Sequence, residues 1–181
     1  MPRWQRRAIG RTSWWGCDLT TILWSKAHNE VAADRQLGSI KLDGGKLFHV
    51  PGGILTGAGY YDEILEVVDW FQSGCKRETI PQLPDRDSGK ESDFLYVDME
   101  TGDAYFLTYP FLRRVKIKEQ FFALGTGGQF AVGALAAGAT PAEAMRIAHK
   151  YDVFTGSTFD IIQVGNNGTS GRKKTVRAKS S

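Results

Sequence analysis

The stretch Thr20–Gln36, "TTILWSKAHNEVAADRQ", decides how this chain folds. Its first part, Thr20–Lys26, is rich in β-branched and aromatic residues and predicts a strand. The letters AHNE supply a turn, and Val31–Asp34 predicts a second strand that returns beside the first. A threonine at this place is commonly a plain strand former, but it is also a nucleophile when its own α-amine is free to act as a base. The function depends on which interpretation holds for Thr20.

The sequence also predicts three helices. Apolar residues recur at helical spacing within Tyr61–Gln72, which indicates an amphipathic helix. An alanine-rich helix is predicted within Gly125–Gly138. A third helix begins after Thr140 as its N-cap, with Pro141 in the first position and Glu143 completing a capping box.

Further strands are predicted between these helices. They cover Lys46–Val50, Ile54–Gly59, a hairpin over Phe94–Tyr109 that turns at Glu100–Asp103, Phe111–Ile117, Gln120–Leu124 and Ser157–Val164. The glycine-containing stretch before Lys46 and residues 73–91 are predicted to be loops. Two antiparallel sheets, covered on their outer faces by helices, would accommodate this order of elements, so an α+β fold is expected.

Charge divides the chain into a body and two basic ends. Residues 1–19 have a net charge of +3 and residues 166–181 one of +5, which leaves −5 for residues 20–165 in a chain of net charge +3. We expect one domain over 20–165, preceded by a disordered extension or pro-segment and followed by a basic, disordered tail. We therefore expect no specific nucleic-acid binding by the acidic body, although the basic tail could touch acidic polymers.

Other features exclude several classes of protein. No apolar run approaches the roughly 18 residues of a membrane span. Two cysteines make no disulfide framework, which fits a reducing compartment, and we expect a cytoplasmic protein. His28, His49 and His149 show no ligand spacing, so no metal site is expected, and no cofactor motif is found.

A threonine nucleophile needs particular neighbours. An N-terminal amine, whose ordinary pKa is about 7.7–8.0, is able to accept the hydroxyl proton, and a nearby cation would favour its neutral form. Lys46 opens the third strand and Asp34 ends the second, so both can reach Thr20 if the strands are neighbours. Each has a simpler interpretation: Asp34 as a turn acid and Lys46 as a solvated charge, with Lys41 competing for the same role.

Small and polar residues complete the candidate set. Gly57 and Gly59 end the fourth strand, where bare backbone N–H groups could hold an oxyanion, or could simply shape the turn into the helix. Thr126 lies in the turn GTGG, which also suits a phosphate-binding loop but lacks the Lys-Ser/Thr of a P-loop. Asp152 and Thr155 follow the third helix and could be ordinary hydrogen-bonding residues at its end.

Taken together, these motifs resemble the proteasome β-subunit family and especially the bacterial HslV peptidases. The similar segments are TTIL, AADRQ, GGKLFHV, ILTGAG, ALGTGGQFAVGAL and AHKYDVFTGS, in this order across nearly all of residues 20–164. The family consists of N-terminal-nucleophile hydrolases. The resemblance therefore implies a four-layer αββα sandwich, a homo-oligomeric ring and a polypeptide substrate, and it suggests an unfoldase ATPase as a partner.

The resemblance also assigns roles to the candidate residues. Thr20 matches the nucleophile and its amine base, Lys46 the active-site lysine and Asp34 the acid that pairs with it. Gly59, with Gly57 nearby, matches the oxyanion-hole segment. Three further matches are Thr126, Asp152 and Thr155, of which the last two correspond to residues that hydrogen-bond around the amine of the threonine.

The sequence departs from the family pattern at three places. The stretch between Asp34 and Lys46 is short, and threonine stands at 126 and 155 where serine is usual. Thr20 also follows Leu19, whereas self-cleaving precursors carry glycine there. The amine of Thr20 is expected to become free either by autolysis after Leu19 or, preferably, because translation starts at Leu19 and the initiating residue is removed.

These observations predict a threonine-type endopeptidase that acts through an acyl-enzyme on Thr20. One alternative is a catalytically silent proteasome-like subunit used for assembly or binding; retention of Thr20 and Lys46 argues against it. Another is amidohydrolysis of a small molecule, as in other N-terminal-nucleophile hydrolases.

Overall fold

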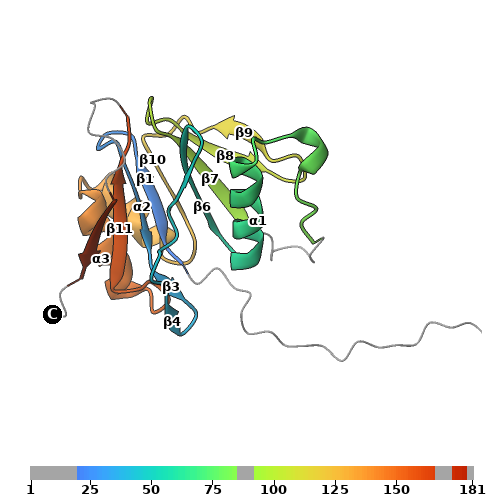
Figure 1. The fold of residues 1–181 in the computed structure, drawn as a ribbon. Helices are drawn as coiled ribbons and strands as arrows, with labels where there is room; N and C mark the ends of the chain where they lie inside the picture. The colour runs from blue at the N-terminus through green and yellow to red at the C-terminus, as the bar shows by residue number, and fades with distance from the viewer. Residues whose placement is uncertain (1–19, 85–91, 166–172, 179–181) are drawn as a thin grey trace, which may run out of the picture.

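The computed structural model describes residues 20–84, 92–165 and 173–178, and Figure 1 shows their arrangement. These residues form twelve strands and three α-helices, and every strand pair is antiparallel, so the fold is mixed α/β with antiparallel sheets. The predictions for residues 1–19, and those for 85–91, 166–172 and 179–181, lie outside the described residues.

The first sheet carries the start of the domain at its centre. Its strand order is β10 (Phe121–Leu124), β1 (Ile22–Ser25), β2 (Glu30–Asp34), β11 (Thr158–Gln163) and β12 (Lys173–Arg177). Ile22 pairs with Ala33 and Phe159 pairs with Asp34. The register therefore brings the N-terminal end of β1, the C-terminal end of β2 and the N-terminal end of β11 to the same end of the sheet.

The second sheet follows chain order. It contains β5 (Phe48–Val50), β6 (Gly53–Ala58), β7 (Asp93–Asp98), β8 (Ala104–Thr108) and β9 (Arg113–Lys116). A separate hairpin, β3 (Gln36–Leu37) and β4 (Ile40–Lys41), joins the two sheets along the chain. Phe48 pairs with Leu55, so the segment that leads into β5 passes close to the C-terminal end of β6.

Hydrophobic side chains fill three regions. Ile22 and Trp24 of β1 pack with Ile54 of β6 and Leu95 of β7, between the two sheets. Leu23, on the opposite face of β1, packs with residues of α2 and α3, so β1 is buried on both faces. A third cluster lies between α1 and the second sheet. Figure 1 shows α1 on one side of the strands and α2 and α3 on the other.

The helices follow the sequence predictions closely. Helix α1 spans Tyr61–Gln72, as predicted, and buries its apolar stripe. Helix α3, Pro141–Tyr151, begins at Thr140 with the predicted capping box to Glu143. Helix α2 is Gly128–Ala136, and its alanines allow close packing against α3.

Three predictions on local structure need correction. Thr20 and Thr21 precede β1 rather than forming part of it. The expected loop after Asp34 contains the β3–β4 hairpin, whose two-residue strands are too short to show a period. The basic tail was expected to be disordered, but Lys173–Arg177 form β12, paired along its length with β11. Backbone hydrogen bonds to β11 and side-chain contacts to Asp160 hold this basic segment in place.

Candidate active site

The side chain of Thr20 lies between a carboxylate and an ammonium group. Its Oγ1 donates a hydrogen bond of 2.7 Å to Oδ1 of Asp34 and accepts one from Nζ of Lys46. All three residues are buried, with exposed fractions of 4% for Thr20, 3% for Lys46 and 0% for Asp34. The three residues that the sequence singled out as nucleophile, acid and lysine are thus in direct contact.

Asp34 is held as a carboxylate by donors on both of its oxygens. Oδ1 accepts from Nζ of Lys46 at 2.9 Å and from the backbone N–H of Thr21 at 3.2 Å. Oδ2 accepts from the N–H groups of Gly156 at 2.8 Å and Gln36 at 3.3 Å. This number of donors compensates for the removal of a charged group from water.

Lys46, rather than Lys41, occupies the position beside Thr20. Lys41 is exposed in β4, whereas Lys46 enters the space at the end of β1 from the segment that leads into β5. Burial lowers the pKa of Lys46 below its ordinary value, and the Asp34 carboxylate opposes this shift. The geometry therefore removes the ambiguity between the two lysines that the sequence left open.

A second group of hydroxyls lies next to the first. Oγ1 of Thr155 contacts Oγ1 of Thr21 at 2.5 Å and donates to Oδ2 of Asp152 at 2.6 Å. Thr126 donates to the same carboxylate oxygen at 2.8 Å. The structure thus brings Thr126, Asp152 and Thr155 together and connects them through Thr21 to the residue that follows Thr20.

Three glycines make room for this packing. A Cβ on Gly125, whose φ is +81°, would overlap the carbonyl oxygen of Thr20. A Cβ on Gly127 would overlap the hydroxyls of Thr21 and Thr155, and one on Gly156 would lie 3.2 Å from Oδ2 of Asp34. Close approach to Thr20 and Thr21 therefore explains Gly125 and Gly127, and close approach to Asp34 and Gln36 explains Gly156.

Gly57 and Gly59 have local reasons to be glycine. Gly57 is a buried residue of β6, where a Cβ would lie 2.7 Å from the carbonyl oxygen of Asp93. Gly59 has a φ of +126°, and a Cβ there would lie 2.5 Å from Oγ of Ser92. Gly57 lies in the C-terminal part of β6 and Gly59 follows the strand, near the place where Lys46 enters, but these contacts reflect packing. Their role in an oxyanion hole stays a prediction.

A buried ion-pair cluster, which sequence reasoning missed, supports the segment before Lys46. Asp160 of β11 is fully buried; its Oδ1 accepts from Arg35 at 2.7 Å, and its Oδ2 lies 2.9 Å from Nζ of Lys173. Arg35 also donates to the carbonyl oxygen of Asp43, and Lys173 donates to that of Gly44. The signal in the sequence was a single charged residue, Asp160, within the predicted strand STFDIIQV.

The neighbours of Asp160 favour the charged form of its carboxyl group. Burial alone would raise the pKa of its carboxyl group, but hydrogen bonds from Arg35, Lys173 and Thr175 outweigh burial and lower the pKa below its ordinary value. The cluster therefore fixes residues 43–45, and with them the approach of Lys46 to Thr20, through a strand near the C-terminal end of the chain.

Within residues 20–84, 92–165 and 173–178, no group of three or more His, Cys, Asp or Glu side chains is placed to hold a metal ion. None of the helices in these segments is long and apolar enough to cross a membrane. No protein-family model matches the chain, and no curated protein sequence matches it either.

Proposed function

We propose that this chain, once it begins at Thr20, is a threonine-type endopeptidase of the proteasome β-subunit and HslV kind. The observation that carries the proposal is the contact of Thr20 Oγ1 with both Lys46 Nζ and Asp34 Oδ1 in a buried site. Once the α-amine of Thr20 is free, the hydroxyl group has a proton acceptor in that amine and a cation in the Lys46 ammonium group.

The proposed mechanism uses the two functional groups of one residue. The free α-amine of Thr20 removes the proton from Oγ1, and the oxygen attacks the carbonyl carbon of a peptide substrate. The Lys46 ammonium donates to Oγ1, stabilises the developing negative charge and favours the neutral amine, while Asp34 orients it. Attack forms the Oγ1–C bond and a tetrahedral oxyanion, and its collapse breaks the C–N bond while the leaving amine takes the proton from the Thr20 ammonium. Water then hydrolyses the ester and restores Thr20.

Other residues have supporting roles in this proposal. Asp152 and Thr155, linked to Thr21, are proposed to orient the freed amine, with Thr126 holding Asp152. Backbone N–H groups around Gly59, with Gly57 beside it, are proposed to bind the oxyanion. The two sheets with helices on their outer sides are proposed to be the αββα sandwich of N-terminal-nucleophile hydrolases. A ring, an unfoldase partner and a cytoplasmic location stay predictions.

The test compares chains that differ only at the proposed site. A chain beginning at Thr20, produced by removal of a cleavable N-terminal fusion, is assayed with fluorogenic peptides beside the full chain and beside Thr20→Ala and Lys46→Met. We expect the full chain and both variants to lose at least about 100-fold in turnover. Lys41→Met is the matched control, because Lys41 is an exposed lysine in the same part of the chain. An ester adduct on Thr20, detected by mass spectrometry, would support the covalent step.

One observation favours the alternative of a catalytically silent subunit. In the full chain Thr20 carries a peptide bond on its nitrogen and is only 4% exposed, so it has no amine base and little access to a substrate. Equal, background turnover from the chain that begins at Thr20 and from Thr20→Ala would refute the peptidase and favour this second function.

A further inference from the structure

A groove lies between α3 and the edge of the first sheet, away from Thr20. It has a volume of about 910 Å³ and is formed by the N-terminal half of α3 together with β2, β11 and β12. One end is formed by His28, Glu30 and Gln163, and Glu30 pairs with Gln163 at the opposite end of β2 from Asp34. We call this feature the α3–β12 groove. Its size is at the upper end of the range for ligand-binding pockets.

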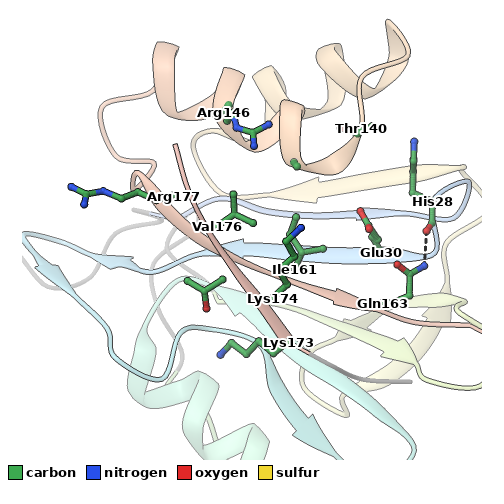
Figure 2. Close-up of a pocket in the computed structure, with 12 residues that line it drawn as sticks. His28, Glu30, Thr140, Arg146, Ile161, Gln163, Lys173, Lys174, Val176 and Arg177 are labelled. Carbon is green, nitrogen blue, oxygen red and sulfur yellow. Dashed lines mark hydrogen bonds between the residues drawn. The ribbon is translucent and has the colours of Figure 1, made fainter. Parts of the chain in front are cut away.

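Positive charge dominates the walls of the α3–β12 groove. Arg146 lies on α3, and Lys174 and Arg177 lie on β12. Figure 2 shows Arg146 and Lys174 near an apolar floor that includes Ile161 and Val176, with Arg177 pointing away from it. Within the described part of the chain, no salt bridge engages any of these three cations. Lys173 also lines the groove, but its ammonium group contacts Asp160. Glu30 is the single acidic residue among the lining residues.

The strand that borders the groove has one unpaired edge. In the described residues β12 is the last strand of its sheet, next to β11. The N–H of Ala178 donates to the carbonyl oxygen of Ser157, so alternate residues of β12 direct their main-chain groups to β11. By the same alternation, the N–H and C=O groups of Lys173, Thr175 and Arg177 point away from β11, toward the outer edge. Such an edge is a template for an added strand.

We propose that the α3–β12 groove binds an extended, acidic peptide segment of a partner protein, which adds as a strand to the free edge of β12. Main-chain hydrogen bonds to β12 supply affinity, and carboxylates at alternate positions meet Lys174 and Arg146 on one face of the added strand. The apolar floor of Ile161 and Val176 receives the aliphatic parts of the same side chains. This proposal is independent of the chemistry at Thr20.

Binding is tested on the full chain with a dye-labelled peptide, Glu-Val-Glu-Val-Glu-Val, by fluorescence anisotropy. We expect saturable binding that weakens when salt rises from about 50 to about 150 mM, because screening reduces the attraction between exposed charges. Arg146→Glu and Lys174→Glu should each weaken binding by about tenfold, since each replaces an attraction by a repulsion. Lys150→Glu is the matched control, because Lys150 is an exposed lysine on the same helix and does not line the groove. It should change binding less than about twofold.

Further peptides test whether binding depends on the charge of the peptide and on its pairing with the edge of β12. The corresponding Lys-Val peptide should not bind. Two variants of the acidic peptide carry N-methyl groups, one on its Glu residues and the other on its Val residues. The N–H groups of the Glu and Val residues point to opposite edges of an extended strand, so one of the two variants should lose binding. Three results would each overturn the proposal. They are absence of binding by the acidic peptide, equal binding by the parent, Arg146→Glu and Lys174→Glu, and equal binding of both methylated peptides. Tighter binding of a single-stranded oligonucleotide than of the peptide would overturn it too. Thr20→Ala should bind normally, which separates this result from the proposed peptidase.

Discussion

The contacts of Asp34 and Lys46 predict that two substitutions at one ion pair have unequal effects on stability. In Lys46→Met the Asp34 carboxylate keeps four donors: the hydroxyl of Thr20 and the N–H groups of Thr21, Gln36 and Gly156. The substitution also removes an ammonium group whose pKa is lowered by burial, which means that its charged form is disfavoured in this site. We expect a loss of about 1–2 kcal/mol in the free energy of unfolding.

Asp34→Asn should be more harmful. It removes the Asp34 carboxylate from Lys46. The NH₂ group of the new amide also has to face a hydrogen-bond donor in either orientation, the N–H of Gly156 or the ammonium group of Lys46. Removal of one partner from a buried ion pair costs about 3–5 kcal/mol, so the difference between the variants should be about 1–4 kcal/mol. In a chain of 181 residues each kcal/mol corresponds to about 2–4 °C in Tm.

Stability, rather than activity, is the quantity to measure, because both substitutions are expected to abolish turnover. Urea unfolding followed by circular dichroism gives the free energies, and Lys41→Met, on the exposed strand β4, should stay within about 0.5 kcal/mol of the parent. If Lys46→Met proved as destabilising as Asp34→Asn, the donors described around Asp34 would not be sufficient to hold its charge, and this reasoning would fail.

Three further predictions concern residues around the site. Asp160→Asn should destabilise the chain near neutral pH. Since the pKa of the Asp160 carboxyl group is lowered in the folded chain, the difference in Tm between the variant and the parent should shrink as the pH falls below the ordinary pKa of 3.8. A difference in Tm that stays unchanged down to low pH would contradict this prediction. Gly127→Ala, at the N-cap of α2, should cost about 1–3 kcal/mol because its Cβ overlaps two hydroxyls. Gly133→Ala, inside α2 with open space around it, should gain about 0.5–1 kcal/mol by urea unfolding. The reverse order would refute the packing described. Thr140→Ala should lower stability by about 1 kcal/mol through loss of the capping box, with a Tm equal to the parent as the contrary result.

The elements that sequence reasoning predicted well have strong local signals. The apolar stripe of α1 repeats over three turns, and the capping residues of α3 mark its start, so neither depends on distant parts of the chain. The contact of Thr20 with Asp34 was predictable because it needed only two neighbouring strands joined by a short turn.

The missed features depend on tertiary contacts. Strand β12 is basic and half exposed, so its sequence has no apolar period, and it is ordered by pairing with β11 and by Asp160. The role of Thr21 was missed because its partner, Thr155, lies 134 positions away in the sequence. The β3–β4 hairpin is likewise too short for any pattern to show.

The ion-pair cluster around Asp160 has a consequence for biosynthesis. The segment that delivers Lys46 is held by Lys173 and Arg35, and Asp34 receives a hydrogen bond from Gly156. A nascent chain therefore lacks these restraints until residues 156–173 have left the ribosome. The contacts that hold Asp34 and the segment before Lys46 thus depend on residues that follow Lys46 by more than 100 positions.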